Sequence, residues 1–220
     1  MMQHHLLDVQ FLQETGMNVA DNDTTQIEEY IIIEHRLPRK RFRRGNVGLA
    51  IILFKRCRAA FRRDGSDKQA YGERMLAARL MFRDKEGKKV KFYLVNAYQP
   101  SDNGTAEGAK SLDDYYEDLR VCLKARKKDE ILIIATDANA PLGCRGMSEA
   151  LGEQLTGAHG NAHRNDAGIQ LREFCNAQAS RAPTTFFTKG EHMRRNRAHQ
   201  LRMCFQQHLE AHAQCPRVPD

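Results

Sequence analysis

The sequence lacks the features that mark several large protein classes. Its 220 residues contain no tryptophan, and aromatic residues make up only 7%. The longest strongly apolar runs, 47–54 and 131–135, are far shorter than the roughly 20 residues that a membrane-spanning helix needs. The six cysteines are irregularly spaced and include no C-x-x-C pair, so neither a disulfide scaffold nor a structural zinc site is expected. No secretory signal is recognisable at the N-terminus. These absences predict an intracellular protein, with the nucleus as a candidate compartment and without a membrane partner.

Positive charge is present in excess and is concentrated in one stretch. Lysine and arginine number 35 against 28 aspartate and glutamate residues, for a net charge of +7. Between Arg36 and Arg63 there are eleven basic residues and no acidic one. This pattern is compatible with a phosphate polymer such as nucleic acid, and equally with a solvated surface. Arg41, Arg43 and Arg44 are the candidate nucleic-acid-binding residues, and no obligate protein partner is inferred.

Apolar patterning predicts an α/β fold with a mixed sheet. Apolar runs and period-two alternation indicate strands, whereas apolar residues spaced three and four apart indicate helices. Residues 130–136 form a continuous apolar run that is typical of a central strand. The predicted strands are 6–14, 30–34, 45–54, 74–83, 90–97, 130–136 and 184–187, and 74–97 is predicted to form a hairpin. The predicted helices are 113–128 and 167–179, and a capping box at Ser111 begins the first of them.

The character of the sequence changes after Phe187. Residues 188–220 are basic and rich in histidine, and they show no strand-like alternation. Leu201, Phe205 and Leu209 would share one face of a helix. We therefore expect a domain over residues 1–187 and a divergent tail over 188–220 that is helical or disordered.

Four polar side chains stand where predicted strands end. Glu14 closes the first strand, Tyr98 follows the strand 90–97, and Asp137 and Asn139 follow the strand 130–136. Sites in open α/β sheets are built at such strand ends. Carboxylate and amide oxygens suit Mg²⁺ or Mn²⁺, whereas zinc would favour histidine and cysteine. Taken singly, each residue has a plainer interpretation: a solvated glutamate, a packing tyrosine and an Asx turn.

The order of four short motifs adds a family resemblance. LQET (12–15), NAYQP (96–100) and TDANA (136–140) resemble motifs of the endonuclease/exonuclease/phosphatase superfamily. GNAHRNDAGIQLREFC (160–175) resembles a segment of retrotransposon endonuclease domains of the non-LTR type, and the likeness extends to craniofacial development protein 2-like proteins. The resemblance covers about residues 6–187.

The resemblance implies a fold and a chemistry. The fold is a four-layer α/β sandwich of two mixed sheets flanked by helices, and the chemistry is phosphodiester hydrolysis assisted by a divalent metal. In this reading Glu14 binds Mg²⁺ or Mn²⁺, and Tyr98 contacts the scissile phosphate. Asp137 orients or deprotonates the attacking water, and Asn139 helps to hold the phosphate. A retroelement-type DNA endonuclease is the implied function.

The sequence departs from the family pattern at both ends. The family's first strand, which carries a metal-binding asparagine, and its closing Ser-Asp-His motif are not found. The sequence therefore predicts a domain that lacks its first and last strands, with Thr136 in place of a glycine. Three alternatives stay open: an inactive relic, a basic nucleic-acid-binding module without catalysis, and a phosphatase of the same superfamily.

Overall fold

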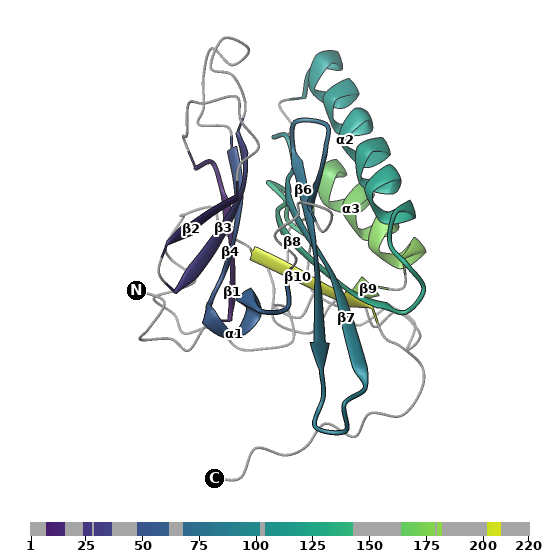
Figure 1. The fold of residues 1–220 in the computed structure, drawn as a ribbon. Coiled ribbons are helices and arrows are strands. Elements are labelled where there is room, and N and C mark those ends of the chain that lie inside the picture. The colour runs from purple at the N-terminus through teal and green to yellow at the C-terminus, as the bar shows by residue number, and fades with distance from the viewer. Residues whose placement is uncertain are drawn as a thin grey trace, which may run out of the picture.

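The computed structural model describes two β-sheets packed face to face, with helices on the outer side of one of them (Figure 1). The described residues are 8–15, 24–27, 29–36, 48–61, 68–101, 104–142, 164–178, 180–181 and 202–207. They account for three of the four predicted layers: a four-stranded sheet, a six-stranded sheet and a helical layer. The α/β fold with two sheets and flanking helices is thus confirmed.

The four-stranded sheet is antiparallel throughout, with the order β1-β4-β3-β2. Its strands are β1 Val9–Gln13, β2 Thr24–Ile27, β3 Tyr30–Arg36 and β4 Gly48–Leu53. Three of them lie where apolar runs predict strands. β2 is missed because its sequence, TTQI, is short and lies within a polar stretch. It is an edge strand, and an edge strand needs only one partner and little apolar character.

The six-stranded sheet is mixed, with the order β5-β6-β7-β8-β10-β9. β7 and β8 are parallel, and the other neighbours are antiparallel. Its strands are β5 Lys68–Tyr71, β6 Met75–Arg83, β7 Lys89–Tyr98, β8 Glu130–Asp137, β9 Ser180–Arg181 and β10 Arg202–Gln207. The predicted β6–β7 hairpin is confirmed, and Asp84 Oδ1 closes its turn by accepting from the backbone N–H groups of Glu86 and Lys88.

Two longer helices cover the outer face of the six-stranded sheet (Figure 1). They are α2 Ala106–Lys124 and α3 Asp166–Ala177, and a short α1 Lys55–Arg58 follows β4. The predicted start of α2 is wrong. The helix begins two turns earlier, where Thr105 Oγ1 accepts from the Gly108 N–H at 3.1 Å. The first turns lack apolar spacing, so periodicity missed them. In the described part of the chain, no helix is long and apolar enough to cross a bilayer.

The structure also corrects the prediction for the tail. Residues 202–207 form a strand, not a helix, and β10 pairs with β8 so that Arg202 lies opposite Asp137. The physical reason is the backbone of β8: its second edge must find hydrogen-bond partners, and this pairing overrides the weak helical spacing. The predicted strand 184–187 lies outside the described residues.

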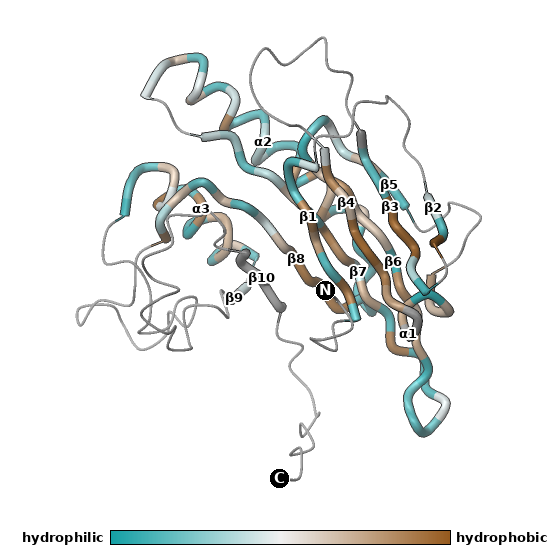
Figure 2. Tube along the Cα trace, turned by 90° about the vertical axis from the view of Figure 1, so that its left-hand side faces the viewer, coloured by the Kyte–Doolittle hydropathy of each residue, from teal (hydrophilic) through white to brown (hydrophobic). Residues whose placement is uncertain are grey.

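Strand alternation divides the interior into two cores. On β7, Tyr93, Val95 and Ala97 face the helices, whereas Phe92 and Leu94 face the four-stranded sheet. Figure 2 shows β4 and β8 largely in brown, the hydrophobic colour, and α2 largely in teal and white. Because both faces of the six-stranded sheet are covered, the strand ends are where polar side chains reach the surface.

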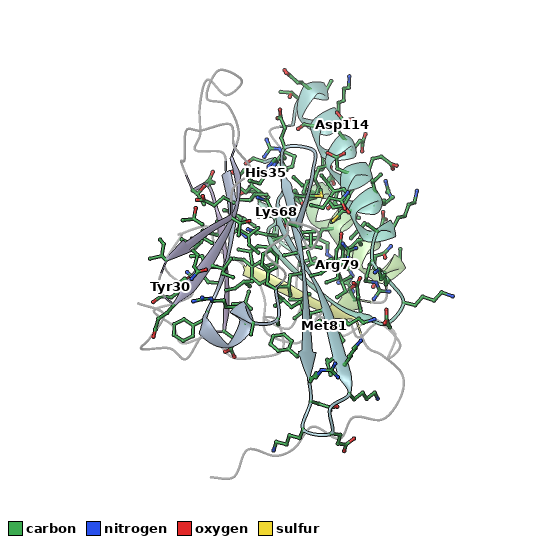
Figure 3. The ribbon with its side chains drawn as sticks, in the orientation of Figure 1. Tyr30, His35, Lys68, Arg79, Met81 and Asp114 are labelled. Atoms are coloured by element: carbon green, nitrogen blue, oxygen red, sulfur yellow. The ribbon has the colours of Figure 1, made fainter. Side chains whose placement is uncertain are left out.

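A buried histidine adds a polar link between the sheets. His35 of β3 donates from Nε2 to the carbonyl oxygen of Gly72, in the turn between β5 and β6, at 3.0 Å (Figure 3). Burial lowers the pKa of His35 below its ordinary value, although the bond to Gly72 acts in the opposite direction. The ring is therefore neutral near pH 7 and serves as a hydrogen-bond donor in the interior.

Candidate active site

The strand ends of the two sheets meet at one point. Tyr98 closes β7 and Asp137 closes β8, and the two are directly opposite in the parallel register. Glu14 follows β1 of the other sheet, 84 residues before Tyr98. The Tyr98 hydroxyl donates to Glu14 Oε1 at 2.6 Å. Residues from three strands and both sheets thus come together as the sequence predicts.

Asn139 completes this group from the loop after β8. Its backbone N–H donates to Asp137 Oδ1 at 3.3 Å, which is the Asx turn expected for Asp-Ala-Asn. Its side-chain Nδ2 donates to the carbonyl oxygen of Gln99 at 2.8 Å. The Asx turn therefore also has a structural role, because the bond from Asn139 to Gln99 connects the end of β8 to the end of β7.

Two members of the group have an unusual backbone conformation. Among the described residues, Glu14 and Asn139 are the non-glycine residues with positive φ, at 54° and 43°. Such conformations cost free energy, least for asparagine, and persist where the surrounding structure holds them. They cluster at functional sites more often than elsewhere. Here the strain coincides with two of the four residues that the sequence singles out.

The electrostatic environment keeps the tyrosine hydroxyl protonated. Burial, together with the hydrogen bond to Glu14 and the charge of that carboxylate, raises the pKa of Tyr98 to about 12. The guanidinium of Arg74 lies over the Tyr98 ring, 5.3 Å from its centroid. At neutral pH the phenol is a neutral donor fixed from both sides. This is the state needed to hydrogen-bond an anionic oxygen.

The Tyr98 pKa supplies a first prediction. We expect Glu14→Gln to lower the pKa of Tyr98, because the substitution removes a negative charge and weakens the acceptor of its hydrogen bond. Tyrosinate absorbance, followed against pH, measures it, and Tyr98→Phe identifies which transition belongs to this residue.

The same shift fixes a pH dependence of stability. The pKa is higher in the folded chain than the value of about 10 in an unfolded one. The stability that the protonated Tyr98 hydroxyl contributes to the fold is therefore complete below about pH 10 and is lost as the pH rises toward 12.

Glu86→Gln, in the exposed β6–β7 turn, is the control for the Tyr98 titration and should leave it unchanged. An unchanged Tyr98 titration in Glu14→Gln would contradict the assignment.

The donor atoms at this point suit a hard divalent cation. Glu14 is exposed, Asp137 and Asn139 are half-buried, and all three present oxygen atoms. Within the part of the chain that the structure describes, no cluster of three or more histidine, cysteine, aspartate or glutamate residues could hold a metal by itself. Mg²⁺ commonly takes one or two carboxylates and completes its shell with water and substrate phosphate. The Glu14 carboxylate, with phosphate oxygens and water, fits that pattern.

The structure bears on the remaining sequence predictions, for the basic residues and the cysteines, to different extents. Arg41, Arg43 and Arg44 lie outside the described residues. The described cysteines Cys57, Cys122 and Cys175 are buried and form no disulfide. Two buried residues of the NAYQP motif, Asn96 and Gln99, support the site but are not singled out by the sequence. Their signal is only that polar residues interrupt an otherwise apolar strand end.

Comparison with known proteins shows that the chain has a known fold. No family model matches the sequence. Craniofacial development protein 2 of Bos taurus is 29% identical over 170 residues, which cover 77% of this chain. The chain spans about a quarter of that relative's length, 24%.

Two solved structures are similar along almost the whole chain. The catalytic domain of Xenopus laevis APE2 superposes with a TM-score of 0.56 at 14% identity, over 94% of this chain and 76% of the other. An AP endonuclease from Archaeoglobus fulgidus gives a TM-score of 0.53 at 12% identity, over 93% and 78%. At these identities the likeness establishes the fold, and the chemistry must be argued from the site.

Proposed function

We propose that this chain, which has the fold of the endonuclease/exonuclease/phosphatase superfamily, is a nuclease that hydrolyses phosphodiester bonds with a divalent metal. The observation that carries the proposal is the convergence of Glu14, Tyr98, Asp137 and Asn139 from β1, β7 and β8 at one end of the two sheets. The resemblance of the motifs that hold these residues supports the same reading.

Each residue has a role that its environment allows. Asp137 is the charged acceptor that orients or deprotonates the attacking water. Asn139 presents an amide donor to the phosphate oxygens as negative charge develops on them. The Tyr98 hydroxyl has a single proton, which it donates to Glu14 in this structure, so it contacts the phosphate by exchanging that acceptor for a phosphate oxygen. Glu14, oriented by the Tyr98 hydroxyl, holds Mg²⁺ or Mn²⁺ together with phosphate oxygens. When bound, the cation neutralises phosphate charge and eases departure of the leaving alkoxide.

DNA is the proposed substrate, and a retroelement-type endonuclease is the proposed class. One of the two similar structures is named as an AP endonuclease and the other as the catalytic domain of APE2, and the segment 160–175 resembles retrotransposon endonucleases. The basic stretch that holds Arg41, Arg43 and Arg44 would supply phosphate contacts that position the strand without specifying sequence. An intracellular, nuclear location follows from that substrate as part of the proposal.

The test is nicking of supercoiled plasmid by the purified chain. We expect nicking with Mg²⁺ or Mn²⁺ and none with chelator. We also expect binding to weaken steeply as salt rises, because phosphate contacts release counterions. A folded protein that does not nick with either cation would overturn the nuclease proposal. Salt-dependent binding without nicking would leave a binding module, and release of phosphate from a monoester substrate would identify a phosphatase.

A further inference from the structure

On β7, a polar side chain follows two apolar ones in the layer between the two sheets. On β7, alternate residues face the four-stranded sheet, and Phe92 and Leu94 pack in that layer. Asn96 is the next residue on the same face, and its exposed fraction is 0%. Burying an amide among apolar side chains is costly unless its hydrogen bonds are satisfied. The position therefore calls for a reason beyond packing.

The Asn96 amide joins the six-stranded sheet to two strands of the other sheet. Its Nδ2 donates to the carbonyl oxygens of Leu12 at 2.8 Å and Ala50 at 2.9 Å. Its Oδ1 accepts from Gln13 Nε2 at 2.6 Å. Both amide hydrogens and the carbonyl oxygen are thus engaged, and each partner lies on β1 or β4. His35 also links the sheets, but from β3 to the β5–β6 turn.

The position of this junction along both strands bears on the site. Leu12 and Gln13 immediately precede Glu14, and Asn96 is two residues before Tyr98 on the same face of β7. After Gln13 the regular strand ends, because Glu14 has positive φ, and the Thr15 N–H then donates to the carbonyl oxygen of Gly48 in β4 at 3.2 Å. The Asn96 amide therefore holds the last two residues of β1, Leu12 and Gln13, directly before Glu14.

We propose that Asn96 is a positioning residue, whose buried amide holds Glu14 at hydrogen-bond distance from Tyr98. The proposal deepens the proposed function and rests on it only for its catalytic consequence. Asparagine suits the place because it supplies two donors and one acceptor in a fixed plane. Aspartate would turn a carboxylate toward two carbonyl oxygens, and leucine would leave both carbonyls without a donor. A satisfied polar group in an apolar core also allows only one relative placement of the sheets.

The test measures the Glu14–Tyr98 interaction itself. A double-mutant cycle of Glu14→Gln and Tyr98→Phe, read from urea unfolding, gives their coupling in the parent and in Asn96→Ala. We expect a coupling of about threefold or more in the unfolding equilibrium constant of the parent, the lower part of the range for contacting residues. That coupling should vanish in Asn96→Ala. Coupling that persists unchanged in Asn96→Ala would overturn the proposal and leave Asn96 a structural residue.

Tyr93→Phe is the matched control. It also removes a buried hydrogen bond, from the Tyr93 hydroxyl to the Cys122 carbonyl oxygen, but on the helical side of β7. The coupling should survive in this variant even if stability falls as much. If Asn96→Ala does not fold, Gln13→Ala removes one bond of the junction and should reduce the coupling in part.

Activity supplies a separate readout. If the parent nicks plasmid, Asn96→Ala should lower kcat by about 10²-fold with a smaller change in KM, as expected for misplacement of a reacting group. Tyr93→Phe should not. An inactive parent in which the coupling still depends on Asn96 would refute the proposed function and leave the positioning role standing.

Discussion

Asparagine in place of Asp137 is expected to lower metal-dependent nicking by about 10³-fold, in the range found for loss of a general base. The substitution keeps the size of the side chain and removes its charge. The side chain is half-buried at the end of β8, so the melting temperature should stay close to that of the parent. Plasmid nicking and thermal unfolding, measured on the same preparations, separate the two effects. Asp137→Ala should be equally inactive.

Asp129 provides a matched control for that experiment. It immediately precedes β8, at the opposite end of the strand from Asp137, and its carboxylate is exposed and paired with Lys91. An exposed ion pair contributes little to stability, so Asp129→Asn should retain parental nicking. If Asp137→Asn nicks DNA like the parent, Asp137 has no part in the reaction. If both variants lose activity equally, the loss reflects net charge and not the site.

The second large effect is expected at Gly168, in the first turn of α3. Its N–H donates to Asn165 Oδ1 at 2.9 Å, which caps the helix. A Cβ at this position would collide with the carbonyl oxygen of Pro141 and would lie 2.9 Å from the carbonyl carbon. Those are backbone atoms between the buried residues Ala140 and Leu142, so they cannot move aside cheaply. Gly168→Ala should therefore destabilise the fold by about 2 kcal/mol, typical of overpacking.

This loss would occur although alanine favours helices over glycine by about 1 kcal/mol. Urea unfolding measures it, with Gln170→Ala as the control on the exposed face of the same helix. That variant should be neutral or slightly stabilising. Gly168→Ala with parental stability would mean that α3 does not pack against the loop after β8 as described. Because that loop also carries Asn139, reduced nicking should accompany the destabilisation.

Local patterns predicted much of the fold because they depend on nearest neighbours. The apolar run 130–136 is long enough and uniform enough to be a buried central strand, and β8 occupies it. Alternation and a turn signal at Asp84 predicted the β6–β7 hairpin. A polar residue that directly follows an apolar run marks the end of the strand. Tyr98 and Asp137 were therefore identifiable as candidates before their partners were known.

What the sequence left undetermined depends on contacts between distant residues. The spacing at Leu201 and Phe205 favoured a helix, yet residues 202–207 pair with β8 because the sheet edge there needs hydrogen-bond partners. The start of α2 was misplaced because a Thr105 cap carries no periodicity. No local signal marks Asn96 as a junction, since its partners lie 46 to 84 residues away.

The sequence by itself therefore determined the α/β class and those strands that have a clear apolar run, since both depend on local polarity. Strand ends and the motif resemblance together singled out the four candidate residues. Only the tertiary structure decided that Glu14 meets Tyr98 across two sheets and that both Glu14 and Asn139 are held in strained conformations. The physical reason is that such a site exists only after sheet packing. The free energy that holds it comes from burial and hydrogen bonds between segments that are independent of one another until the chain folds.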